Sequence, residues 1–179
     1  MKKIFIVIIG MIILTGCKSK LGNTPVNKVE DYINKYQTLD VSVLKSLENV
    51  LSTEEYNSEQ KEKYKDIVKK NYQKIMYEIK NDSTDGDIAI VEVEVTVVDY
   101  SKINNEVDLY LLNNSEEFKT LEGEFDISKV IDYRLEKMDK AKETVTYTLE
   151  IELHKENDEW IVDDLDEVEL SKINGTYNY

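Results

Sequence analysis

The hydrophobic pattern of the chain changes its period near residue 75. Before that point, apolar residues recur every three or four positions, which is typical of amphipathic helices. Thr24 followed by Pro25 predicts an N-cap and the first position of a helix, and Asp40 predicts the N-cap of a second. A third helix is expected over 58–74. The folded part of the chain is therefore predicted to begin with three helices.

Beyond that point, alternation of apolar and polar residues predicts strands. The four predicted strands cover 75–79, 88–100, 144–155 and 160–162. Asp85-Gly86 is a hairpin turn signal between the first two. A closing helix follows the fourth strand; we expect it to carry Leu165, Val168 and Leu170 and to stop at Asn174-Gly175.

A helical insertion of roughly 101–143 separates the second and third strands. Asp126 is expected to cap its second helix, with Val130, Ile131, Leu135 and Met138 on the buried face. Alternating strands form a sheet with one dry and one wet face. The order of elements predicts an α+β fold, in which helices pack on one face of a curved antiparallel sheet and a helical insertion lies between strands 2 and 3.

The N-terminus has the form of a secretory signal. Three residues with two lysines precede eleven mostly apolar residues, 4–14. As a helix these would reach only about 16 Å, about half of a bilayer core. Leu14-Thr15-Gly16-Cys17 resembles a bacterial lipobox, in which the cysteine thiol takes a diacylglyceryl group. A plain secretory signal with an unmodified cysteine is the alternative. The sequence thus predicts a signal peptide over 1–16, a lipidated Cys17 with a tether over 17–24, and one α+β domain over 25–179.

Charge and composition narrow the expected partners. The 179 residues carry 23 Lys and Arg against 37 Asp and Glu, a net charge of −14, which argues against nucleic-acid binding. One cysteine and one histidine exclude a disulfide framework and ordinary structural zinc sites. We expect a protein anchored by lipid on Cys17 at the outer face of the bacterial cytoplasmic membrane, with an unknown small ligand or an envelope protein as partner, and no cofactor or metal.

Tyrosine is the side chain that suits a binding cavity here, because it joins an apolar body to a polar tip. The candidate lining residues are Tyr32, Tyr36, Tyr64, Tyr72, Tyr77 and Tyr147. A well-packed tyrosine-rich core is the alternative. His154 is expected to be solvated at a strand end. The segment 81–92 superficially matches a calcium loop but is better explained as a plain hairpin, because a strand follows where a helix is required.

Two segments resemble a known group. The run 25–32 (PVNKVEDY) and the run 159–165 (EWIVDDL) resemble an uncharacterised group of lipoproteins from low-GC Gram-positive bacteria. The resemblance implies a nuclear transport factor 2-like, cystatin-like domain and carries no catalytic signature. We therefore expect a non-enzymatic ligand- or protein-binding module. One alternative is an isomerase or hydrolase of the same fold, with Asp126 or Asp132 as the acid in the cavity. The other is a structural envelope partner that acts through the helical insertion.

Overall fold

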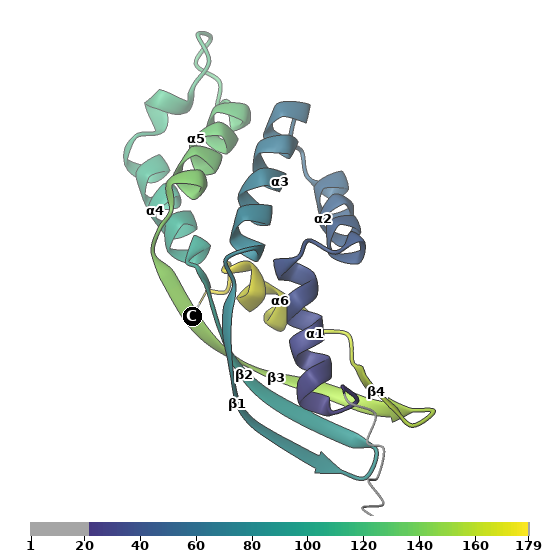
Figure 1. Cartoon of the computed structure of the whole chain (residues 1–179). Coiled ribbons are helices and arrows are strands. Elements are labelled where there is room, and N and C mark those ends of the chain that lie inside the picture. Colours follow the sequence, from purple (N-terminus) through teal and green to yellow (C-terminus); the bar gives the residue numbers. More distant parts are fainter. Residues whose placement is uncertain (1–21, 179) are drawn as a thin grey trace, which may run out of the picture.

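The computed structural model describes residues 22–178 (Figure 1). The predicted signal peptide 1–16 and Cys17 lie outside the described residues. In chain order the elements are α1 (Pro25–Gln37), α2 (Val41–Thr53), α3 (Ser58–Tyr72), β1 (Met76–Asp85), β2 (Ile88–Val98), α4 (Tyr100–Asn113), the short 3₁₀ helix η1 (Ser115–Phe118), α5 (Ile127–Lys140), β3 (Thr144–Glu156), β4 (Glu159–Val162) and α6 (Glu167–Asn174). No helix among these residues is long and apolar enough to cross a membrane.

The four strands form one antiparallel sheet in the order β1-β2-β3-β4. The sheet is strongly curved, with the helices on one of its faces, and α4 and α5 extend beyond one end of it (Figure 1). The α+β prediction, including the helical insertion between β2 and β3, is therefore confirmed. The hairpin turn is also where the sequence places it: β1 ends at Asp85, Gly86 has a φ of +60°, and β2 begins at Ile88.

Side-chain caps fix where the helices begin. The side-chain oxygens of Thr24, Asp40 and Asp126 accept backbone N–H groups at the starts of α1, α2 and α5. Each cap satisfies one of the donors that the first turn of a helix leaves without an intrahelical partner. These three helix starts are confirmed as predicted.

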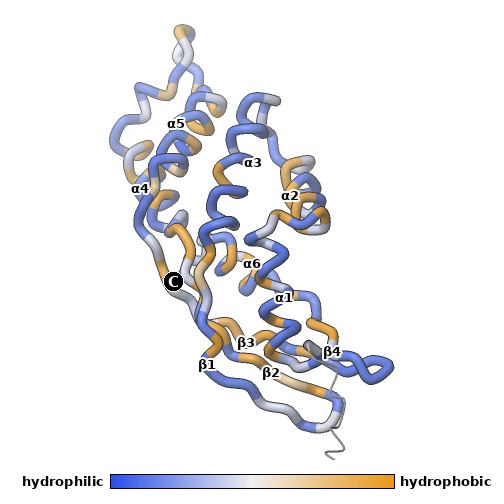
Figure 2. The backbone as a smooth tube through the Cα atoms, in the orientation of Figure 1, coloured by the Kyte–Doolittle hydropathy of each residue, from blue (hydrophilic) through white to orange (hydrophobic). Residues whose placement is uncertain are grey.

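The core lies between the dry face of the sheet and the helices. The alternating residues of β2 and β3 point into it and are at most 3% exposed, namely Val91, Val93, Val95, Val97, Tyr147, Leu149, Ile151 and Leu153. Val29 and Ile33 of α1 and Ile173 of α6 cover them. Figure 2 shows the hydrophobic residues along β2 and β3. The space between sheet and helices is thus filled by side chains.

The insertion has a smaller core of its own. Leu135 and Met138 of α5 pack with Ile67 of α3 and Tyr100 of α4. Gln60 of α3, 3% exposed, joins α5 by donating hydrogen bonds to Ser128 and to the Asp132 carboxylate, the latter at 2.8 Å. The arm formed by α4 and α5 is therefore held to the rest of the domain mainly through α3.

The closing helix begins later than its apolar residues suggest. α6 starts at Glu167, so Leu165 lies before it and packs against the core, whereas Val168 and Leu170 are 46% and 37% exposed and α6 buries Ile173. The chain already contacts the sheet just before α1. The Asn23 side chain donates to the Asp158 carbonyl and accepts from the Trp160 amide, which fixes the chain to the turn between β3 and β4.

Candidate functional site

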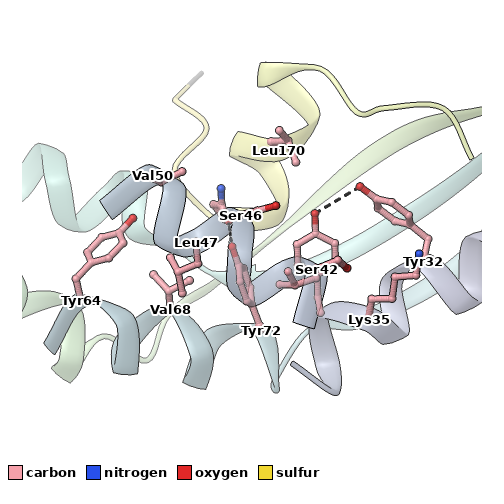
Figure 3. A pocket seen from close by; sticks show the side chains of 13 residues that line it. Tyr32, Lys35, Ser42, Ser46, Leu47, Val50, Tyr64, Val68, Tyr72 and Leu170 are labelled. Carbon is pink, nitrogen blue, oxygen red and sulfur yellow. Dashed lines mark hydrogen bonds between the residues drawn. The ribbon is translucent and has the colours of Figure 1, made fainter. Parts of the chain in front are cut away.

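A cavity of about 210 Å³ lies between α1, α2, α3 and α6 (Figure 3). We call it the tyrosine pocket. Its thirteen lining residues are Tyr32, Lys35, Tyr36, Ser42, Val43, Ser46, Leu47, Val50, Tyr64, Val68, Tyr72, Leu170 and Asn174. No strand residue is among them. The pocket is therefore formed by helices alone, is open to solvent on one side, and borders the filled layer above the sheet through Val68 and Tyr72.

Helical spacing and one tight turn bring the lining residues together. Tyr32 and Tyr36 lie one turn apart on α1, so both side chains project from the same face. Leu39 then takes a φ of +56°, and α2 folds back with Val43 and Leu47 turned toward α1. The left-handed region is unfavourable for leucine, so the packing around this turn has to hold it there.

The tyrosine rings pack edge to face along one side of the pocket. Tyr36 meets Tyr72 with ring centroids 5.1 Å apart and the rings at 85°, and Tyr32 lies 5.8 Å from Tyr36. Such contacts add to the free energy gained from burying the rings. The Tyr72 hydroxyl donates to Asn174 Oδ1 at 2.8 Å, which ties α3 to α6. In Figure 3 this bond and the Tyr32–Tyr36 contact are drawn as dashed lines.

Burial keeps the hydroxyls of the pocket protonated. It raises the pKa of Tyr64 to about 12, and it raises the pKa values of Tyr36 and Tyr72 well above the usual value. The pKa of Tyr32 is also raised, chiefly by burial, and the carboxylates of Asp164 and Glu169 add to the rise. These phenols are therefore neutral at physiological pH and offer O–H donors.

The six tyrosines singled out from the sequence divide into two groups. Four of them line the tyrosine pocket. Tyr147 does not: it is 3% exposed in the core, where its hydroxyl donates to the Tyr177 carbonyl. Tyr77 lies on β1, the edge strand of the sheet, and packs against the margin of the core. Both belong to the layer between sheet and helices, and that layer is filled.

The acidic residues considered for catalysis lie elsewhere. Asp126 caps α5, and Asp132 accepts the hydrogen bond from Gln60. Asp132 also lines a polar cleft between α3 and α5, together with Lys63 and Glu136. No carboxylate is among the thirteen residues that line the tyrosine pocket.

The remaining candidates are placed as follows. His154 is half exposed, and its ring nitrogen pairs with the Asp163 carboxylate, a partner that the sequence did not suggest. The segment 81–92 forms the β1–β2 hairpin, with Asn81 opposite Glu92. Among the described residues, no group of three His, Cys, Asp or Glu side chains is placed to hold a metal ion.

Sequence reasoning missed several residues of the pocket. Ser42 and Ser46 lie one turn apart on α2, on the side that carries Val43 and Leu47, and this spacing could have suggested a polar edge to that apolar face. Nothing in the sequence around Lys35 indicates that it lines a pocket. The sequence indicates Asn174 only as part of a helix stop, whereas its side chain lines the pocket and accepts the hydrogen bond of Tyr72.

Comparison with known proteins adds little. No protein-family model matches the chain, and no curated protein does. Among solved structures it is similar to the crystal structure of a putative lipoprotein (ycdA) from Bacillus subtilis, with 19% identity and a TM-score of 0.44. The match covers 83% of this chain and 46% of that chain, so this chain spans about half the length of the structure it matches. Such a likeness does not assign a family or an activity.

Proposed function

We propose that this chain is a lipid-anchored protein of the bacterial cell envelope whose folded domain binds a small molecule in the tyrosine pocket without transforming it. The pocket is the observation that supports binding: a concave site with apolar walls and several convergent hydrogen-bond donors is the usual form of a ligand site. The absence of a carboxylate from its lining supports binding without acid–base chemistry.

The lipobox supports the anchor. After Leu14, the small residues Thr15 and Gly16 stand directly before Cys17, whose thiol would carry the lipid. Two or three acyl chains give stable attachment, where one chain alone binds only marginally. The curved sheet with helices on one face also suits the cystatin-like fold that the resemblance implies, with the difference that the cavity lies between helices.

The anchor is tested by Cys17→Ser. We expect the variant to leave the membrane fraction and to keep its signal segment, because the lipidated thiol is what the processing step requires. Ser19→Ala, two residues along the tether, is the matched control and should fractionate like the natural protein. A Cys17→Ser protein that is still processed and still membrane-bound would refute the anchor.

Binding is tested by filling the pocket. Val68 is 6% exposed and lines the cavity, so Val68→Phe places a ring where a ligand would lie. Small molecules extracted from the purified natural protein should include a compound that is missing from the variant, provided that both unfold at similar temperatures. Identical extracts would contradict a ligand in this pocket.

A second candidate function rests on the end of the insertion. Residues 119–125, which we call the tip hairpin, are closed by a bridge between Lys119 and Phe125. Leu121 at its end is fully exposed, and Phe125 and Ile127 are 54% and 58% exposed. A formed hairpin that presents apolar side chains to solvent is typical of a docking element.

We propose an envelope protein with an apolar groove and basic rim as the partner of the tip hairpin, because Glu122 and Glu124 flank its apolar residues. A photo-crosslinking residue at position 121 should give one discrete adduct in living cells. The same residue at Val41, which is 79% exposed on α2, is the control and should not give that adduct. Equal adducts at both positions would refute the docking role.

A further inference from the structure

We propose that the tyrosine pocket selects an uncharged molecule of about the size of one substituted aromatic ring, which carries an oxygen that accepts hydrogen bonds. This inference rests on the proposed binding function and specifies its ligand class. Three features carry it: the donors that the pocket leaves unused, the distribution of charge between its lining and its mouth, and its size.

The pocket offers donors that the protein does not use. Among the described residues, the Tyr64 hydroxyl and the Ser46 hydroxyl form no hydrogen bond, and Asn174 uses its carbonyl oxygen for Tyr72 while its NH₂ group remains available. All three groups can donate. Ser46 is exposed, whereas Tyr64 and Asn174 are half-buried. A ligand that supplies acceptor oxygens would satisfy the Tyr64 and Asn174 donors, whereas a purely apolar ligand would displace water from them without replacing its hydrogen bonds, which costs free energy.

Charge is unfavourable for ligands of either sign. A cation that enters the pocket leaves behind the carboxylates near its mouth and meets none in the lining, so the lost hydration of its charge is not compensated inside. An anion would meet Lys35, which lies at the rim over the ring of Tyr32. Against that single cation stand the carboxylates near the mouth: Asp40, which accepts the Ser42 hydroxyl, and the Asp164 and Glu169 side chains that act on Tyr32. An uncharged ligand avoids both penalties.

The size and walls of the pocket set the body of the ligand. A volume of about 210 Å³ exceeds the roughly 150 Å³ of an apolar protein cavity that binds benzene. Val43, Leu47 and Val68 form an apolar side, and the rings of Tyr36 and Tyr72, packed edge to face, form an aromatic one. Apolar and aromatic walls around a space of this size suit one apolar ring rather than a polycyclic molecule.

Three probes that share a phenyl ring test the charge preference directly: benzamide, benzoate and benzylammonium. The full-length protein is reconstituted in nanodiscs, and binding is measured by ligand-observed NMR against empty nanodiscs. We expect benzamide to bind, and the two ions to bind about tenfold more weakly or not at all, which corresponds to the loss of one good interaction. Benzylammonium or benzoate binding as tightly as benzamide would overturn the inference.

Two variants locate the probe. Val68→Phe should abolish benzamide binding by filling the pocket, and Tyr64→Phe should weaken it roughly fivefold by removing one donor while leaving the ring. Benzamide binding that survives Val68→Phe would overturn the location. If a charged probe is preferred and Val68→Phe abolishes its binding, the ligand class is wrong but the binding function stands. If no probe binds and no cellular ligand is recovered, both fail.

Discussion

Tyrosine hydroxyls determine the chemistry of the pocket, and their burial also links the stability of the protein to alkaline pH. The pKa of Tyr64 in the folded protein is raised to about 12, above the usual value of about 10 that applies in the unfolded chain. Below pH 10 the phenol is protonated in both states. As the pH rises above 10, the unfolded chain releases its proton first, so the free energy of unfolding falls.

We therefore expect the free energy of unfolding to be insensitive to pH just below 10 and to fall steeply between pH 10 and 12. Tyr64→Phe should make that fall shallower, because one of the shifted phenols is removed. Chemical denaturation at a series of pH values checks this. An exposed phenol offers no such coupling, so equal slopes for the two proteins would show that Tyr64 titrates like a solvated tyrosine.

Gly175 is a second residue whose place in the fold is specific. It ends α6 with a φ of +73°, and its carbonyl accepts the Ser101 amide at the start of α4. A Cβ at this position would lie 2.0 Å from the Val98 carbonyl oxygen. The backbone of β2 cannot move aside as a flexible side chain would. Replacing Gly175 by alanine therefore combines a steric overlap with an unfavourable left-handed backbone.

Gly175→Ala should thus lower the free energy of unfolding by roughly 3 kcal/mol or more, as close overlaps in a packed interior do. Gly86→Ala is the matched control, since its φ of +60° is similar but nothing lies within 4 Å of its added Cβ. The control should cost only about 1 kcal/mol, the penalty of the left-handed backbone alone. If denaturation shows the same loss of unfolding free energy for both variants, the close approach of residue 175 to Val98 does not contribute to stability.

At the scale of elements, the helices and strands follow from local signals, whereas the pocket does not. The caps at Thr24, Asp40 and Asp126 and the alternation along β2 and β3 are readable in the sequence, and each acts over a few residues. The pocket depends on how α2 and α6 are placed against α1 and α3. That placement is non-local, so no spacing within one element reveals it.

The same dependence on non-local contacts explains why the sequence does not predict the partners of Tyr147, His154 and Asn23. Tyr147 alternates correctly along β3 and was a reasonable candidate for the pocket, yet its partner Tyr177 comes from the C-terminal segment. His154 meets Asp163 because the chain turns back after β3 and pairs β4 with it. Asn23 reaches Asp158 across most of the sequence. Contacts of this kind appear only when the whole chain is folded.

The junction between α3 and the insertion offers a test at the element scale. Gln60 directs its NH₂ group at the Ser128 and Asp132 oxygens. Gln60→Glu replaces that donor by a carboxylate, which would face the carboxylate of Asp132 in a buried position. We expect the free energy of unfolding to fall by about 3 kcal/mol at neutral pH, because the new carboxylate is charged at a buried position and is repelled by Asp132 instead of donating to it.

Chemical denaturation measures this loss, and Glu59→Gln, one residue earlier on the exposed side of α3, is the control and should change the free energy of unfolding by less than about 0.5 kcal/mol. Acidification should restore part of the loss in Gln60→Glu by protonating the new carboxyl group. A Gln60→Glu protein as stable as the natural one would show that the insertion does not depend on this junction.

At the scale of the whole molecule, the start of the folded chain and the tip hairpin lie at opposite ends of the domain. Asn23 fixes the start of the folded chain to the β3–β4 turn, at one end of the sheet, while α4, α5 and the tip hairpin extend beyond the other end (Figure 1). Cys17 precedes Gly22 by five residues, a span of at most about 18 Å. A lipid on Cys17 would therefore hold the sheet end near the membrane and direct the tip hairpin away from it.

Native mass spectrometry can detect a small ligand in the tyrosine pocket. The mature protein is purified gently from membranes of its host, and we expect a reproducible extra mass, at one copy per chain, that is absent from Val68→Phe. A mass equal to that of the lipidated chain alone in both proteins would contradict ligand binding in the pocket and leave the tip hairpin as the functional surface.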